Sequence, residues 1–179
     1  MEEPGFLREA GIELPLYFDH GMYSWNHLAG AAMEQYGADR LTIPVELNER
    51  EIRESGVRGE MIVYGYLPMM ISAQCIRKTT LGCSGKPEVM WLKDRKEMRF
   101  PVVNQCRFCY NTISLLGLSG QVAGLKPVAI RLNFTAEEPD AVGEILDAFF
   151  EEYEMGEKAA EPAVLKNQFT RGHFKRGVE

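Results

Sequence analysis

Four apolar runs stand out in the pattern of hydrophobic and polar positions, and one of them, residues 60–72, is rich in β-branched residues. They cover residues 14–19, 39–45, 60–72 and 127–134, and polar or turn-forming residues bound each of them. Runs of this kind, without helical periodicity, are typical of buried strands. We therefore expect four strands that lie in one sheet.

Helical patterns separate or follow these strands. Asn26 is placed to cap a helix that Gly37 ends, and Asn48 is placed to cap a shorter one. After the last strand, Thr135 and Glu138 have the spacing of a capping box. An apolar stripe at helical spacing follows and consists of Val142, Ile145, Leu146, Phe149, Phe150 and Tyr153. Strands that alternate with helices predict an α/β fold with a parallel sheet.

The segment 75–124 interrupts this alternation. Within it, residues 90–103 have the pattern of a β-hairpin that turns at 94–97. We expect residues 1–156 to form one α/β domain that carries 75–124 as a cysteine-rich hairpin insertion. The remaining residues, 157–179, are polar and basic and are expected to form a C-terminal tail.

The number of expected strands restricts the architecture. Four parallel strands with their helices are half of a closed eight-stranded barrel, and an open half leaves sheet edges uncovered. The pattern therefore fits either a small open sheet or the C-terminal part of a larger barrel.

All four cysteines lie in the insertion, at Cys75, Cys83, Cys106 and Cys109. Four thiolates form a complete ligand set for a tetrahedral zinc ion or a 4Fe–4S cluster. Only the last pair has the Cys-x-x-Cys spacing of a zinc knuckle, and the first pair is separated by seven residues. The spacing alone leaves zinc and an iron–sulfur cluster open.

Composition and charge indicate the cellular compartment of the protein and the partners that it is expected to lack. The chain of 179 residues carries a net charge of −6, which argues against a broad non-specific nucleic-acid surface. Its first residues are acidic where a secretory signal is basic, and no apolar run has the length of a membrane span. We expect a cytoplasmic protein that does not enter the membrane, where clustered thiols more often bind metal than form disulfides.

The residues around the cysteines resemble a known family. VYGYLPMMISAQC, then GC, then LKDRKEMRFPVVNQCRFCYNTI are similar to segments of the peptidase U32 family of collagenase-like proteins. LTIPVELNEREI (41–52) and the closing TRGHFKRGVE (170–179) match as well. The resemblance runs from about Leu14 to the last residue, and its most specific part is 63–111.

The resemblance implies a TIM-like barrel whose four cysteines hold a 4Fe–4S cluster. The implied ligands are Cys75, Cys83, Cys106 and Cys109. The matching residues correspond to the C-terminal half of the barrel, so the chain is expected to be a fragment. The implied partner is the N-terminal half of the barrel, or another chain that supplies it.

The resemblance also implies an activity. Characterised relatives act in the hydroxylation of RNA bases or of a quinone ring without molecular oxygen, so RNA is an expected partner. The family name implies peptide hydrolysis instead, but neither G-x-S-x-G nor H-E-x-x-H occurs in the sequence. No catalytic residue is assigned.

Five residues are candidates for substrate binding: Tyr64, Arg77, Lys93, Arg95 and Arg131. Tyr64 lies on an expected parallel strand in the region where barrel active sites gather. The basic residues near the cysteines would bind phosphate or another anion, or would form a solvated face of the hairpin. Arg131 would bind substrate or pair with Glu46 in the core.

Overall fold

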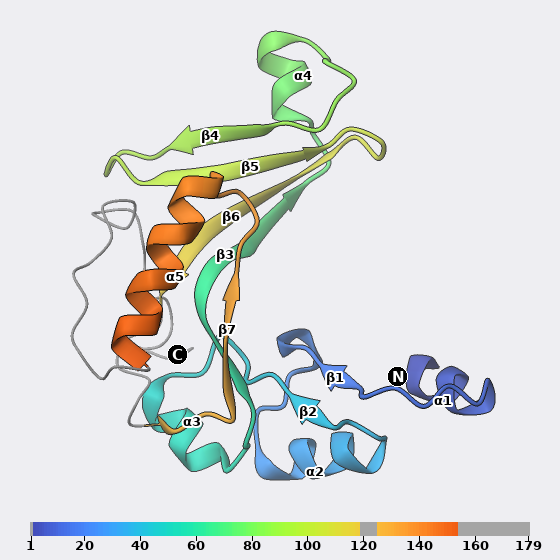
Figure 1. Cartoon of the computed structure of the whole chain (residues 1–179). Coiled ribbons are helices and arrows are strands. Elements are labelled where there is room, and N and C mark those ends of the chain that lie inside the picture. Colours follow the sequence, from blue (N-terminus) through green and yellow to red (C-terminus); the bar gives the residue numbers. More distant parts are fainter. Residues whose placement is uncertain (1, 119–124, 154–179) are drawn as a thin grey trace. The chain divides into compact units, whose positions relative to one another are not determined.

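The structure is a computed structural model that describes residues 2–118 and 125–153. The expected C-terminal tail, 157–179, lies outside these residues. The described chain divides into two compact units, one of residues 2–63 and 125–132 and the other of residues 64–118 and 133–153. The ribbon in Figure 1 is coloured along the sequence and labels the elements of both units.

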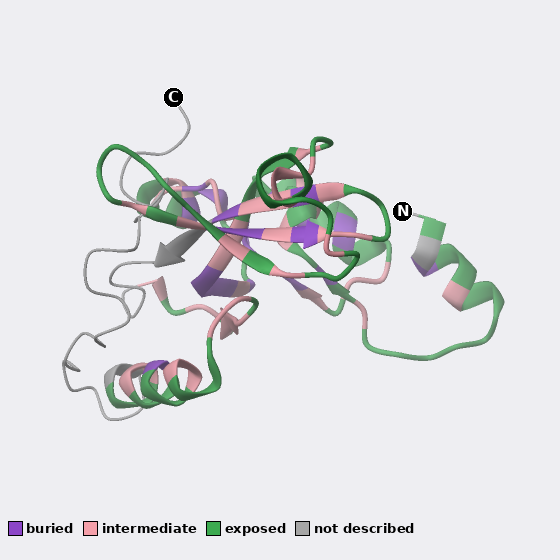
Figure 2. Ribbon diagram, turned by 90° about the horizontal axis from the view of Figure 1, so that it is seen from above, coloured by how far each residue is buried: buried purple, intermediate pink, exposed green. Residues whose placement is uncertain are grey.

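The first unit is built from short parallel strands and capped helices. α1 (Glu2–Glu9), which is mostly exposed in Figure 2, precedes β1 (Tyr17–Phe18) and the 3-10 turn η1 (His20–Met22). α2 (His27–Gln35) connects β1 to β2 (Arg40–Leu41), and these two strands pair in parallel. α3 (Glu49–Ser55) then leads into β3 (Glu60–Ser72), whose first residue forms a parallel bridge with Thr42.

Local signals set the starts of α2 and α3 in this unit. The Asn26 side chain accepts a hydrogen bond from the Ala29 N–H at 2.9 Å, as an N-cap does. Asn48 and Glu51 form a reciprocal capping box at the start of α3. The apolar side chains between these elements form the core of the unit: Phe18, Met33, Leu41, Ile43, Leu47, Ile52, Val57, Met61, Ile62 and Val63.

The second unit is organised around antiparallel strands. β4 (Val89–Lys93), β5 (Arg99–Gln105) and β6 (Tyr110–Leu118) follow the six-residue helix α4 (Ile76–Leu81). The five-stranded sheet has the order β4-β5-β6-β3-β7, in which β4/β5, β5/β6 and β6/β3 are antiparallel. The arrows of β3 and β7 (Ala129–Asn133) point the same way in Figure 1, so the sheet is mixed.

The last helix, α5 (Pro139–Tyr153), contributes Ile145 and Phe149 to the core of the second unit. The side-chain hydrogen bonds before this helix are made by Glu137 and not by the expected capping box of Thr135 and Glu138. The Glu137 carboxylate instead accepts from the backbone N–H groups of Thr135 and Ala136, at 2.6 Å and 2.9 Å. A carboxylate here complements the positive end of the helix dipole.

The mixed α/β class is confirmed, as are the strand 60–72, the caps of α2 and α3, and the hairpin of β4 and β5. The expectation of a sheet that is parallel throughout is wrong, because β6 pairs antiparallel with β3, β5 with β6 and β4 with β5. Across residues 2–118 and 125–153 no closed barrel forms. No helix in those ranges is long and apolar enough to cross a membrane.

Candidate metal centre

The four cysteines come from three segments of the second unit. Cys75 follows the end of β3 and caps α4, and its Sγ accepts from the Lys78 N–H at 3.4 Å. Cys83 lies in the loop between α4 and β4, and Cys106 and Cys109 lie in the turn between β5 and β6. β3 and β6 are antiparallel, so the end of β3 lies beside the start of β6. The strand pairing thus brings Cys75 to the end of the sheet that carries the Cys106–Cys109 turn.

The turn between β5 and β6 holds its two cysteines in a tight loop. Gln105 and Tyr110 are the last paired residues of the two strands, and the Phe108 N–H donates to the Gln105 carbonyl at 3.0 Å. Cys109 has a φ of 56°, in the left-handed region that non-glycine residues seldom adopt. Its thiol lies 3.7 Å from the Cys106 carbonyl oxygen. Both thiols are therefore presented at the tip of one hairpin.

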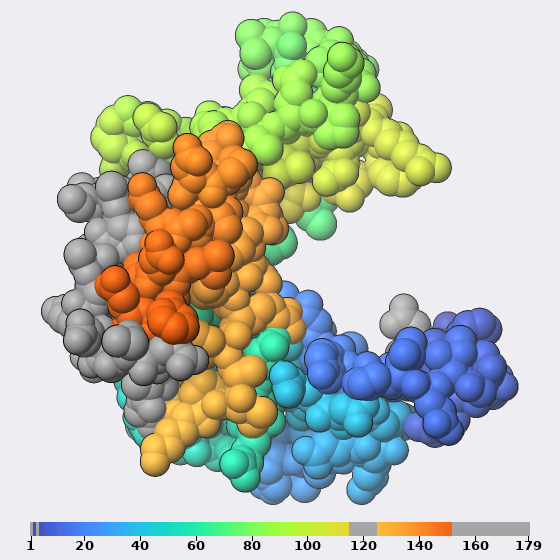
Figure 3. Space-filling view, viewed as in Figure 1, coloured from blue at the N-terminus to red at the C-terminus, as the bar shows by residue number. Residues whose placement is uncertain are grey.

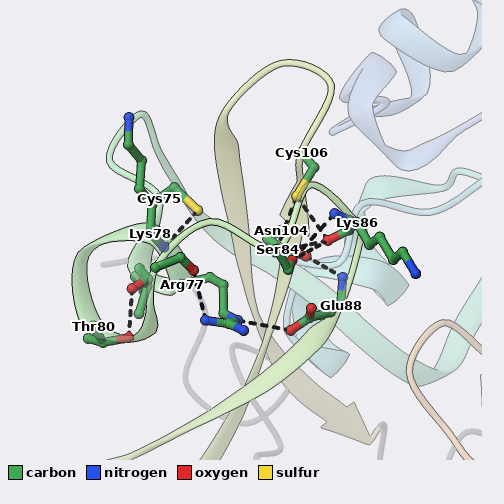
Figure 4. Close-up of polar contacts among 11 residues, drawn as sticks. Cys75, Arg77, Lys78, Thr80, Ser84, Lys86, Glu88, Asn104 and Cys106 are labelled. Carbon is green, nitrogen blue, oxygen red and sulfur yellow. Dashed lines mark hydrogen bonds and ion pairs between the residues drawn. The ribbon is translucent and has the colours of Figure 1, made fainter.

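The loop that carries Cys83 is tied down by Arg77 of α4. The guanidinium donates to the Gly82 carbonyl at 2.7 Å and forms an ion pair with Glu88 at 3.1 Å. The Ser84 hydroxyl and the Arg77 guanidinium lower the pKa of the Glu88 carboxyl below its usual value. Figure 4 shows Arg77 between the helix and the Glu88 side chain. This candidate for substrate binding therefore holds the Cys83 loop, and its charge is already paired.

The thiol of Cys106 lies within electrostatic range of the other three. Burial and then the neighbouring thiols of Cys83, Cys75 and Cys109 raise the pKa of Cys106. The same thiol donates to the Lys86 carbonyl at 2.9 Å, and the Asn104 amide lies 3.5 Å from its Sγ. All four cysteines are free thiols, and Cys83 and Cys109 are exposed. The donor set suits a soft metal such as zinc or iron.

The thiols are not gathered around one point. Within the described chain, no three His, Cys, Asp or Glu side chains are arranged so that they would hold a metal ion. The Cys106 thiol is directed at a backbone carbonyl instead. Ligation would therefore require the thiols to lose their protons and turn from such partners toward a common centre.

Two asparagines next to the cysteine turn were not singled out in the sequence. Asn104 lies two residues before Cys106, and Asn111 lies two residues after Cys109. Both are fully buried, with 0% exposure, and they are paired directly across β5 and β6. Asparagine is depleted in strands, so two of them flanking Cys-x-x-Cys at equal distance were the available signal.

Tyr64 lies in the core of the second unit. Its side chain is 1% exposed, and its hydroxyl donates to Glu137 at 2.8 Å. Burial and then the hydrogen bond to Glu137 raise the pKa of the hydroxyl. The ring lies 5.4 Å from that of Phe134 and 6.1 Å from that of Phe149. These contacts give Tyr64 a packing role.

Lys93 and Arg95 lie at the other end of the β4–β5 hairpin. Lys93 ends β4 and forms an ion pair with Glu97, and Arg95 follows in the turn. β5 has seven residues, so it separates this turn from the cysteine turn by roughly 20 Å at about 3.3 Å per residue. The two basic residues therefore do not share a site with the cysteines.

Arg131 lies in the first unit, where its guanidinium is fully engaged. It donates to Asp19 and to the Thr42 hydroxyl, both at 2.8 Å, and forms an ion pair with Glu60. These partners replace the expected one, Glu46, whose Oε2 is buried without a hydrogen-bond partner. The arrangement connects β7 with the first residue of β3 and with the residues that follow β1 and β2.

In comparisons with known proteins, no family model, no curated protein and no solved structure matches the chain.

Proposed function

We propose that the cysteine end of the second unit binds a 4Fe–4S cluster through Cys75, Cys83, Cys106 and Cys109. The observation that carries this proposal is the strand pairing that brings Cys75, which follows β3, to the end of the sheet that carries the Cys106–Cys109 turn. Cubane clusters are held by four cysteine thiolates, and the chain supplies that number. The choice of iron and sulfide over zinc rests on the resemblance to U32 proteins.

Each part of the site has a role in this proposal. The β5–β6 turn presents two thiolates, the cap of α4 presents a third, and the Arg77-held loop presents the fourth. When bound, such a cluster supplies one-electron transfer, because four cysteines leave no open iron position. The chain's own contribution is to hold the thiolates and to set the polarity around them.

The resemblance extends the proposal to an enzyme class. The chain would be the C-terminal half of a TIM-like barrel in a cytoplasmic U32-type protein that hydroxylates RNA or a small aromatic compound without oxygen. The parallel pair β1/β2 and the parallel bridge between Thr42 and Glu60 support the barrel assignment. The N-terminal half, in the same or another chain, would complete it.

Peptide hydrolysis, which the family name implies, has less support. Nucleophilic proteases require a serine or cysteine beside a histidine. Among the described histidines, His20 lies against the Asp19 carboxylate at 3.1 Å and His27 is the first residue of α2. The four cysteines are taken up as cluster ligands in this proposal.

A structural zinc site is the second candidate. The observation that favours it is the Cys106–Cys109 pair at the tip of a hairpin, because paired cysteines at this spacing are common in zinc sites. The same four residues would then stabilise the fold and carry no electrons.

Metal analysis of the anaerobically purified chain distinguishes these functions. A cluster predicts about four irons and four acid-labile sulfides per chain, lost in Cys83→Ser and Cys106→Ser. One zinc without sulfide, lost in the same variants, would replace the cluster by a structural metal. Iron that is unchanged in both variants would overturn the ligand assignment.

A further inference from the structure

A row of three polar residues crosses the sheet beside the cysteine turn. The strand register places Asn104 of β5 opposite Asn111 of β6, and Asn111 opposite Ser72 of β3. Residues that are directly opposite in a sheet share one face, so the three side chains lie side by side. The two asparagines are fully buried, and burial of a side-chain amide costs free energy unless the amide forms hydrogen bonds.

Asn104 connects the row to the loop that carries Cys83. Its Oδ1 accepts from the Glu88 N–H, and its Nδ2 lies 3.5 Å from the Lys86 carbonyl. The same Nδ2 lies 3.5 Å from Cys106 Sγ. Figure 4 shows Asn104 between Lys86, Glu88 and Cys106. One side chain therefore touches two of the cysteine-bearing segments.

Asn111 connects the row to the segment that carries Cys75. Its Nδ2 donates to the Gln74 carbonyl at 2.6 Å and lies 3.5 Å from the Ser72 carbonyl. Gln74 directly precedes Cys75, so this amide fixes the backbone from which the Cys75 thiol projects. The Oδ1 of Asn111 is buried without a partner. The contacts of this amide with Ser72 and Gln74 are therefore made by its donor group.

We propose that Asn104 and Asn111 are positioning residues that hold the three cysteine segments in register for metal binding. This inference rests on the proposed metal centre and extends it to two residues that are not ligands. α4 has no fully buried residue, so apolar packing holds this helix only weakly between Cys75 and Cys83. Side-chain amides supply part of the missing restraint, and groups behind the ligands commonly change metal affinity 10–100-fold, as an order of magnitude.

The first test is the rate of iron loss from the full chain, reconstituted with ferrous iron and sulfide, after a chelator is added. Asn104→Ala and Asn111→Ala should lose iron roughly ten-fold faster than the unchanged chain, or more. Asn48→Ala, which removes an asparagine cap in the other unit, is the matched control and should not change the rate. Equal rates in all three variants would overturn the proposal.

Asn104→Asp separates positioning from contact with the thiolate. The aspartate keeps an oxygen for the Glu88 N–H but loses the amide donor toward Cys106. This variant should keep its iron and show a lower reduction potential than the unchanged chain, because it loses a hydrogen bond to the ligand sulfur and places a carboxylate beside it, and both changes lower the potential. An unchanged potential would contradict the role of Asn104 at Cys106.

Hydrogen exchange tests the positioning role without metal. In the apo chain, Asn104→Ala should speed exchange of the Glu88 amide, and Asn111→Ala should speed exchange around Cys75, while α3 is unaffected. Absence of iron in the unchanged chain would refute the proposed function, and faster local exchange would still support the positioning role. Unchanged exchange at both places would refute the positioning role whether or not iron binds.

Discussion

Different interactions stabilise the interior of the first unit and the cysteine end of the second unit. The first unit buries apolar side chains from β1, β2, α2, α3 and the start of β3 against one another. The cysteine end of the second unit instead rests on side-chain bonds to backbone atoms, made by Arg77, Asn104 and Asn111. Figure 3 shows one face of both units in a space-filling view that is coloured along the sequence. The comparison shows that side-chain hydrogen bonds, more than an apolar core, hold the loops at the cysteine end in place.

The helix α4 shows this difference most directly. It has six residues and buries none of them, whereas α2 and α3 each bury two. A helix this short is marginal in water without packing or another restraint. Binding of a metal by Cys75, Cys83, Cys106 and Cys109 would close α4 between two ligands and supply that restraint.

Metal removal should therefore have the largest effect, and it should be local. Structural metals contribute on the order of 10 kcal/mol in small zinc domains. Stripping the metal should strongly increase amide exchange in 74–88 and 104–111 and leave α2 and α3 unchanged, as measured by hydrogen exchange with mass spectrometry. Equal loss of protection in both units would contradict the comparison.

A matched pair of leucines tests the apolar side of the comparison. Leu41 is 3% exposed in the core of the first unit, and Leu81 is 69% exposed in α4. Leu41→Ala should lower the free energy of unfolding by about 2–5 kcal/mol, and Leu81→Ala by less than about 0.5 kcal/mol. Denaturant titration measures both. A large loss in Leu81→Ala would show that α4 is packed after all.

A matched pair of glycines tests the close approach inside the second unit. Gly65 of β3 has a φ of 153°, and a Cβ there would lie 2.8 Å from the Asn133 backbone oxygen. Gly65→Ala should therefore cost about 1–3 kcal/mol of unfolding free energy. Gly143→Ala, in α5 with no atom near the added methyl, should stabilise by about 0.5–1 kcal/mol. Thermal unfolding that gives both variants the same sign would contradict this account.

Removal of the ion pair between Asp19 and Arg131 in the first unit should have the smallest effect on the free energy of unfolding. Burial alone would raise the pKa of the Asp19 carboxyl, but the His20 N–H, the Arg131 guanidinium and the His20 ring lower it overall. A lowered pKa means that the stabilisation is complete above the unfolded value near 3.9 and is lost as the pH falls through the folded value. Asp19 is 58% exposed, so the gain is at most about 1 kcal/mol.

Asp19→Asn should accordingly be less stable than the unchanged chain at pH 7, with the difference disappearing at the acid end. Denaturant midpoints at several pH values measure this. Glu54→Gln, which removes an exposed pair with Arg50, is the control and should change stability little at any pH. A constant difference for Asp19→Asn down to pH 2 would exclude titration as its cause.

Local signals made part of the fold predictable. Asn26, Asn48 and the turn at 94–97 each act through neighbours only a few residues away, and the structure has each of them as expected. β6 was not predicted, because its mixed run has no clear alternation and its partner β3 lies about 40 residues earlier. The antiparallel pairing of β6 with β3 is what makes the sheet mixed.

Of the candidate site, only the proposed ligands could be named from the sequence. Four cysteines in one segment are visible in the sequence, but Asn104 and Asn111 acquire a role only through the register of three strands. The sequence left Arg77 as an anion-binding or solvated residue and offered Glu46 as a partner for Arg131, whereas the structure pairs Arg77 with Glu88 and Arg131 with Asp19 and Glu60. Partners that are distant in sequence, as with Arg131, cannot be read from local pattern.

Extended X-ray absorption fine structure of the metal in the purified chain tests the central claim most directly. The account predicts a ligand shell made only of sulfur in the anaerobically purified chain, with neighbouring irons at the next distance. Cys106→Ser should introduce an oxygen or lose the metal. A shell of nitrogen and oxygen in the unchanged chain would contradict a centre held by Cys75, Cys83, Cys106 and Cys109.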